Sequence, residues 1–71
     1  MKLPRDLSGR QVVRALRRLG FVEEHQVGSH IRLSKSGLRV TIPNHASIAP
    51  KTLQSILRQA QITIEDLRKV L

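Results

Sequence analysis

Apolar residues recur at the spacing of a helix near the beginning of the chain. The repeating positions are Val12, Ala15, Leu16 and Leu19. Before them, Ser8 and Gln11 form a capping-box sequence, in which two side chains satisfy free backbone amides at a helix start. After them, Gly20 can adopt the left-handed conformation that often ends a helix. The pattern predicts a helix between Ser8 and Gly20 with one apolar face turned toward a core.

Alternation with a period of two replaces the helical spacing in the middle of the chain. Residues 30–34 and 38–42 alternate apolar and polar side chains, and residues 21–26 show a mixed pattern. Because the connections are short, these segments predict an antiparallel meander of three strands. Its apolar face is expected to carry Ile31, Leu33, Leu38, Val40 and Ile42, and its polar face His30, Arg32, Arg39 and Thr41.

Helical spacing returns after Pro50, a residue that suits the first turn of a helix. The apolar positions of this second helix are Leu53, Ile56, Leu57 and Ala60. Thr63 and Asp66 then form the sequence of a cap for a short final helix. The order α-β-β-β-α-α predicts an α+β fold, with the helices packed on one face of the sheet and one domain spanning residues 1–71.

The net charge of the chain indicates what kind of partner it binds. Thirteen Lys and Arg residues against five Asp and Glu residues give a formal net charge of +8, and nine of the cations are Arg. This excess favours a polyanionic partner, with nucleic acid ahead of a membrane surface or an acidic protein. A basic surface without a specific partner is the plain alternative. Phe21 is the only aromatic residue, so contacts to the phosphate backbone are expected rather than base stacking.

Several classes of function are excluded by composition. The absence of Cys removes disulfides, thiolate metal sites and cysteine nucleophiles. No apolar run approaches the ~20 residues of a membrane span, and residues 1–6 lack the apolar core of a secretion signal. His25, His30 and His45 match no compact metal-ligand spacing. We therefore expect a cytoplasmic protein without a metal or other cofactor.

Gly28-Ser29-His30 is the strongest candidate for chemistry. Gly28 permits an unusual backbone between the first two strands, and His30 opens the second strand on its polar face. An imidazole with a pKa of about 6.5 exchanges protons near neutrality. A histidine at a strand end is more often only a polar surface residue. The functional alternative is a general base for the 2′-hydroxyl of RNA, which attacks the adjacent phosphorus without a metal.

A stripe of arginines lies opposite the apolar face of the first predicted helix. Its members are Arg10, Arg14, Arg17 and Arg18, with no acidic residue between Ser8 and Leu19. Like charges at this spacing repel each other by a few tenths of a kcal/mol per pair. The stripe is interpreted either as a solvated helix face or as a longer-range RNA contact, for which Arg10 and Arg14 are the candidates.

Four segments together resemble the HicA toxin family. They are Leu19-Gly20-Phe21, Gly28-Ser29-His30, the run from Val40 to His45 and the run from Thr52 to Ala60. The similarity extends over nearly the whole chain, from residue 7 to residue 71. It implies a fold similar to that of a double-stranded-RNA-binding domain, with three antiparallel strands and helices on one face. This agrees with the order of elements inferred from the hydrophobic pattern.

The resemblance also implies a function and a partner. Members of this family are mRNA interferases of type II toxin–antitoxin pairs, which cleave mRNA and inhibit translation. His30 takes the place of the family's catalytic histidine, with Gly28 and Ser29 as its supporting turn. The implied partner is a HicB antitoxin that covers the active face, and no direct DNA contact is expected from the toxin. The substrate contacts expected near His30 are Arg32, Arg39, His45 and Lys51.

The chain departs from the family pattern at Val27, Asn44, Lys51 and Gln61. Gln61 stands where a glycine often ends the second helix, so it must adopt a left-handed conformation or the chain must turn differently.

Two other functions stay open at this point, because a fold does not determine an activity. One is a non-catalytic RNA-binding module, and the less favoured one is a DNA-binding regulator.

Overall fold

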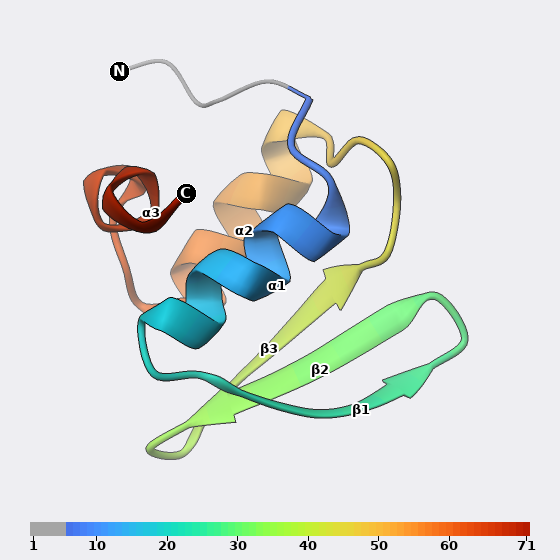
Figure 1. Cartoon of the computed structure of the whole chain (residues 1–71), viewed down its shortest axis with the longest axis horizontal. Helices are drawn as coiled ribbons and strands as arrows, with labels where there is room; N and C mark the ends of the chain where they lie inside the picture. The colour runs from blue at the N-terminus through green and yellow to red at the C-terminus, as the bar shows by residue number, and fades with distance from the viewer. Residues whose placement is uncertain (1–5) are drawn as a thin grey trace.

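The computed structural model describes residues 6–71, which form an α-β-β-β-α-α chain (Figure 1). The elements are α1 (Gly9–Arg18), β1 (Val22–Val27), β2 (His30–Lys35), β3 (Leu38–Pro43), α2 (Pro50–Ala60) and α3 (Ile64–Val70). Residues 1–5 of the segment considered as a possible signal lie outside the described residues. Within residues 6–71, no helix has the length and apolar character needed to cross a membrane.

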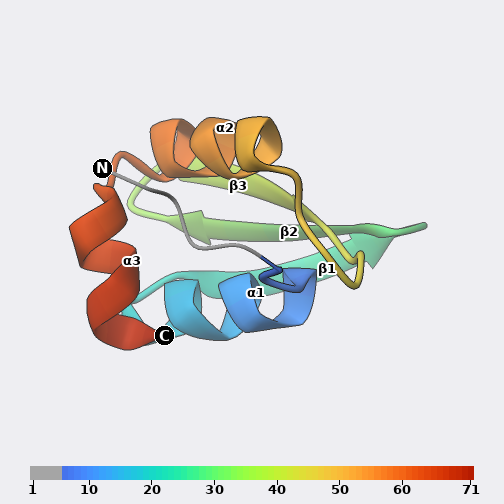
Figure 2. The ribbon, with the colours of Figure 1, turned by 90° about the horizontal axis from the view of Figure 1, so that it is seen from above.

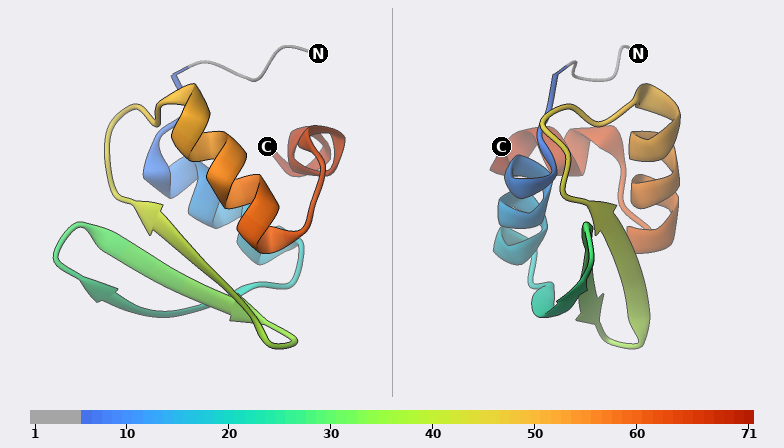
Figure 3. Two further views of the ribbon diagram at one scale, coloured as in Figure 1. Left: turned by 180° about the vertical axis from the view of Figure 1, so that it is seen from behind. Right: turned by 90° about the vertical axis from the view of Figure 1, so that its right-hand side faces the viewer.

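The three strands form one antiparallel sheet with β2 in the centre. Ile31 pairs with Ile42 and Leu33 pairs with Val40, so these four side chains share one face. Figure 2 and Figure 3 show α1 and α2 on that same face, with α1 along β1 and α2 along β3. The α+β class, the antiparallel meander and the single helical layer are therefore confirmed. No helix within residues 6–71 covers the other face of the sheet, which is called the open face below.

Apolar side chains fill the space between the sheet and the helices. The largest fully buried ones are Leu16, Ile31, Leu33, Ile42, Leu53, Ile56, Leu67, Val12 and Val40. Phe21 is also buried but precedes β1, so the predicted first strand, 21–26, is shifted by one residue from the observed Val22–Val27. Val13, absent from the predicted apolar face, is buried as well. The reason is that α1 contacts both edge strands and α3, which widens its buried face.

Both predicted capping boxes are present. Ser8 Oγ accepts from the Gln11 amide at 3.1 Å, and Gln11 Oε1 accepts from the Ser8 amide at 2.8 Å. Asp66 makes the equivalent exchange with Thr63 at the start of α3. The hydrogen bonds from Thr63 hold the pKa of the Asp66 carboxyl below its usual value, and the nearby Lys69 charge acts in the same direction. These caps satisfy the free amides of two helix starts.

The end of α2 shows which of the two expected alternatives Gln61 adopts. This residue has φ 55° and ψ 43°, the left-handed conformation, and its amide donates to the carbonyl oxygens of Arg58 and Leu57. The chain thus keeps the helix ending that glycine usually provides, but with a residue that carries a Cβ. A left-handed conformation costs such a residue about 1–2 kcal/mol.

Candidate functional site

The turn between β1 and β2 consists of Gly28 and Ser29, and its backbone is held by two hydrogen bonds. Gly28 has φ +60°, and glycine at the first position of a two-residue turn is typical of a type II′ hairpin. Gln26 Nε2 donates to the Gly28 carbonyl oxygen at 2.9 Å. The Asn44 amide donates to the Ser29 carbonyl oxygen at 2.6 Å. Gln26 is not among the residues predicted from the sequence, although its position two residues before a turn glycine allows this bond.

His30 follows directly from this turn and begins the central strand. Its backbone pairs with Val27 on one side and Pro43 on the other. The residue is exposed, on the face opposite the buried Ile31. Since the described helices lie on the other face (Figure 3), the His30 imidazole is open to a large ligand. The predicted placement on the polar face of the sheet is confirmed.

Arg32 is the cation closest to His30 in the register of the sheet. It lies two residues further along β2, on the same open face, opposite His25 in β1 and Thr41 in β3. Residues two apart on a strand are separated by roughly 7 Å. Arg32 is thus placed to bind an anion that also contacts His30.

Arg39 lies further away than expected. It pairs with Ser34, four residues along β2 from His30, which corresponds to about 13 Å. The prediction that it lies beside His30 is wrong, because the turn at residues 36–37 puts Arg39 at the opposite end of the sheet. It shares the open face with Arg32, where both line a shallow hollow together with Glu24, His25 and Thr41.

His45 lies in the loop that follows β3. Its carbonyl oxygen accepts from the Gly9 amide at 2.8 Å, and the preceding residue, Asn44, is bonded to Ser29. The His45 side chain is exposed. The loop is therefore fixed both to the start of α1 and to the turn that carries His30.

The remaining predicted contacts lie in the helical layer. Lys51 is in the first turn of α2, which begins on the far side of the helices from the open sheet face (Figure 1). The loop 44–49 joins the end of β3 to this turn, and a role for Lys51 in RNA binding stays a prediction. Arg10 in α1 forms an ion pair of 3.7 Å with Glu23. Its guanidinium is half exposed, and such surface pairs contribute only about 0–1 kcal/mol.

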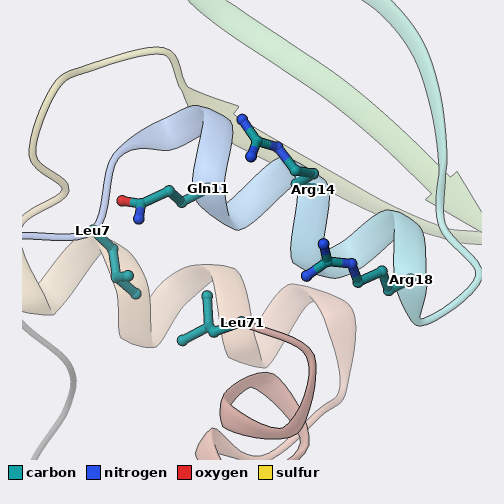
Figure 4. Close-up of a pocket in the computed structure, with 5 residues that line it drawn as sticks. All are labelled: Leu7, Gln11, Arg14, Arg18 and Leu71. Carbon is teal, nitrogen blue, oxygen red and sulfur yellow. The ribbon is translucent and has the colours of Figure 1, made fainter.

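Arg14 and Arg18 belong to a different part of the surface. Figure 4 shows both side chains beside Leu7, Gln11 and Leu71, in a depression between α1 and the end of the chain. Arg18 also donates to the Val70 carbonyl oxygen at 2.6 Å, which ties α1 to α3. The predicted arginine stripe is exposed, but it lies on the side of the molecule that does not carry His30.

In the described part of the chain, no group of three or more His, Cys, Asp and Glu side chains could hold a metal ion. What the open face offers is an exposed imidazole at the start of the central strand, an arginine two residues further along, and a turn fixed by hydrogen bonds. This arrangement suits proton transfer at a phosphodiester.

Comparison with models of protein families shows to which family this chain belongs. The model of the HicA toxin of bacterial toxin–antitoxin systems matches residues 9–62. The chain belongs to the HicA toxin family. The match runs from the first residue of α1 to just beyond α2 and includes the turn and His30. Comparison with curated proteins gave no match. Membership in the HicA family implies the toxin of a toxin–antitoxin pair, with a cognate antitoxin as its partner.

Proposed function

We propose that this HicA toxin is a metal-independent endoribonuclease in which His30 acts as the general base. The observation that carries the proposal is the placement of His30. It is exposed at the start of the central strand, on a turn fixed by Gln26 and Asn44, with Arg32 two residues along the same open face.

The reaction uses the nucleophile that RNA itself supplies. His30 accepts the proton of a 2′-hydroxyl, and the oxygen attacks the adjacent phosphorus. The bond from phosphorus to the 5′-oxygen breaks, and this oxygen takes a proton from an acid or from water, which leaves a 2′,3′-cyclic phosphate and a 5′-hydroxyl. The Arg32 guanidinium binds the non-bridging oxygens, where negative charge develops in the transition state. DNA lacks the 2′-hydroxyl and is not cleaved.

Backbone contacts rather than base stacking hold the substrate. The Phe21 ring is buried in the core, with the Lys35 ammonium 5.7 Å from its centre, so it offers no stacking surface. Arg39 extends the cationic surface along the open face. His45, exposed in the loop after β3, is proposed as a further substrate contact. The cations of the helical layer contact more distant segments of a long mRNA; they are Arg10, Arg14 and Lys51.

The cognate antitoxin is proposed to be of the HicB type and to cover the open sheet face. Two features support this: the face is not covered by any helix within residues 6–71, and the chain carries a net charge of +8 that an acidic partner would neutralise. The toxin would act in the cytoplasm, where it meets mRNA. It needs no DNA contact of its own for this function.

The decisive experiment compares the wild-type toxin with His30→Ala on a defined single-stranded RNA in EDTA. The wild type is expected to cleave and to leave a 2′,3′-cyclic phosphate, identified by mass spectrometry. His30→Ala is expected to fold with the same melting temperature and to leave the RNA intact. A substrate with 2′-deoxyribose at the cleaved position should resist both proteins.

Two results would contradict the proposal. Full activity of a folded His30→Ala protein would remove His30 from the reaction, and cleavage that disappears in EDTA would show that a metal takes part. Binding of RNA without cleavage by the wild type would instead support a non-catalytic RNA-binding module, the alternative that the fold and charge also allow.

A further inference from the structure

A β-bulge in β1 determines which side chains reach the open face. Glu23 pairs with Leu33 and His25 pairs with Arg32, so Glu24 is an extra residue without an opposite partner. Simple alternation from Glu23 would put His25 on the core face. The bulge instead turns His25 to the open side, where it faces Arg32. Bulges are common next to active sites, where they redirect a side chain in this way.

The same register makes His25 a neighbour of His30. The pair Val27–His30 lies next to the pair His25–Arg32 along the same face, so the two histidines are diagonal partners across β1 and β2. Diagonal partners have Cα atoms about 7–8 Å apart. Two imidazoles at that separation leave room for one phosphate between them, and Arg32, opposite His25, completes a triangle around it.

We infer that His25 is a second catalytic residue, the general acid that protonates the leaving 5′-oxygen. The inference rests on the proposed ribonuclease function. In the completed step, the proton of the 2′-hydroxyl passes to His30, and the proton of the His25 imidazolium passes to the 5′-oxygen. One phosphorus–oxygen bond forms and one breaks, and no other reactant is needed. In-line attack needs acid and base on opposite sides of the phosphorus, which the diagonal placement provides.

The side chains around His25 on this face are basic or polar. Arg32 and His30 face it from β2, and Arg39 and Thr41 line the same hollow from β3. The carboxylate of Glu24 also lines this hollow, and its Oε2 accepts from Ser34 Oγ at 2.8 Å. The arginines attract the phosphate and leave proton donation to the imidazole, since guanidinium does not release its proton in proteins.

The test uses two substrates that differ only in the leaving atom. One is an RNA with an ordinary linkage, and the other has sulfur in place of the bridging 5′-oxygen, because a thiolate leaves without protonation. His25→Ala is expected to cleave the ordinary RNA about 100-fold more slowly than the wild type, or slower still. It is expected to cleave the sulfur-bridged RNA at close to the wild-type rate. His30→Ala should be inactive on both substrates.

The control variants test whether His25 acts by donating a proton, by its positive charge or by supporting the fold. His25→Arg keeps a positive charge without a transferable proton, so it should be as slow as His25→Ala on ordinary RNA. Val22→Thr, on the same strand and the same face, should leave the rate unchanged. Melting temperatures show whether each variant is folded.

The outcomes distinguish the inference from the proposal on which it rests. Wild-type activity that depends on His30 but not on His25 would overturn the role of His25 alone. The same holds if His25→Ala is equally slow on both substrates, or if His25→Arg is fully active. A wild-type protein that leaves both substrates intact would overturn the ribonuclease function and the role of His25 together.

Discussion

The backbone amide of Gly9 donates a 2.8 Å hydrogen bond to the carbonyl oxygen of His45. This hydrogen bond connects the first residue of α1 to the loop after β3. Gly9 also lies so close to the Pro43 carbonyl oxygen that a Cβ could not be accommodated without movement of the backbone. The same loop reaches the turn before His30 through the hydrogen bond between Asn44 and Ser29. A glycine in α1 is thus connected to the position of His30 by two backbone hydrogen bonds.

Gly9→Ala should destabilise the fold and slow RNA cleavage together. The added Cβ collides with the Pro43 carbonyl, and overpacking of this kind typically costs about 1–3 kcal/mol. The shift of loop 43–45 would also loosen the turn that positions His30. Urea unfolding and the cleavage rate of the folded variant measure the two effects.

Gly37→Ala provides the comparison. Gly37 has φ +83° and open space around it, so alanine there is strained by its backbone conformation without colliding with a neighbour. This variant should lose about 1 kcal/mol of stability and keep its cleavage rate. Equal losses of activity in the two variants would contradict the proposed connection from Gly9 to His30.

Gln61→Gly should stabilise the protein. Gln61 is held in the left-handed conformation at φ 55°, which glycine adopts without a steric penalty. Part of that gain is offset by the greater freedom of glycine in the unfolded chain, so the net gain is expected to be up to about 1 kcal/mol. For a domain of this size that corresponds to a rise in melting temperature of about 4–8 °C.

Gln54→Gly is the matched control for this prediction. Gln54 is an exposed residue inside α2, where the same substitution should destabilise by about 1 kcal/mol. Opposite signs for two Gln→Gly changes in one region would identify backbone conformation as the cause. A fall in melting temperature for Gln61→Gly would show that the strain it relieves is smaller than the entropy that glycine adds to the unfolded chain.

Asp66→Asn should lower the melting temperature at neutral pH but leave it unchanged in acid. The hydrogen bonds from Thr63 lower the pKa of Asp66 in the folded state, so the charged carboxylate stabilises the fold. This contribution is complete above the usual carboxyl pKa of 3.8 and disappears as the pH falls through that value and the lower folded pKa. Melting temperatures of the two proteins should differ at pH 7 and converge as the pH falls below the lowered pKa of the folded state. A difference that is constant with pH would contradict this.

The local elements were predictable because their causes are local. The two capping boxes are short sequence motifs, and β2 and β3 follow from alternation in residues 30–34 and 38–42. His30 was placed on the polar face by the same alternation. For Gln61, the family resemblance left two alternatives, a left-handed residue or a different turn, and the structure has the first.

The features that sequence analysis missed depend on pairing between distant segments. The bulge at Glu24 exists only because of how β1 aligns with β2, and without it His25 would not face Arg32. The position of Lys51 relative to the sheet depends on the path of loop 44–49, which carries no periodic pattern. The close approach of Gly9 to Pro43 likewise needs the three-dimensional fold, since 34 positions separate the two residues in the sequence.

Arg32→Ala should weaken RNA binding and reduce its dependence on salt. Each phosphate neutralised in a single-stranded RNA contributes about 0.7 to the slope of log K against log salt concentration. With a short 2′-O-methyl RNA, which cannot be cleaved, Arg32→Ala should lower the slope by about that amount. Arg14→Ala should leave it unchanged, because Arg14 lies on the helical side (Figure 4), and should lower it only for a longer RNA. Equal effects of the two variants on the short RNA would mean that the substrate does not bind at the open sheet face.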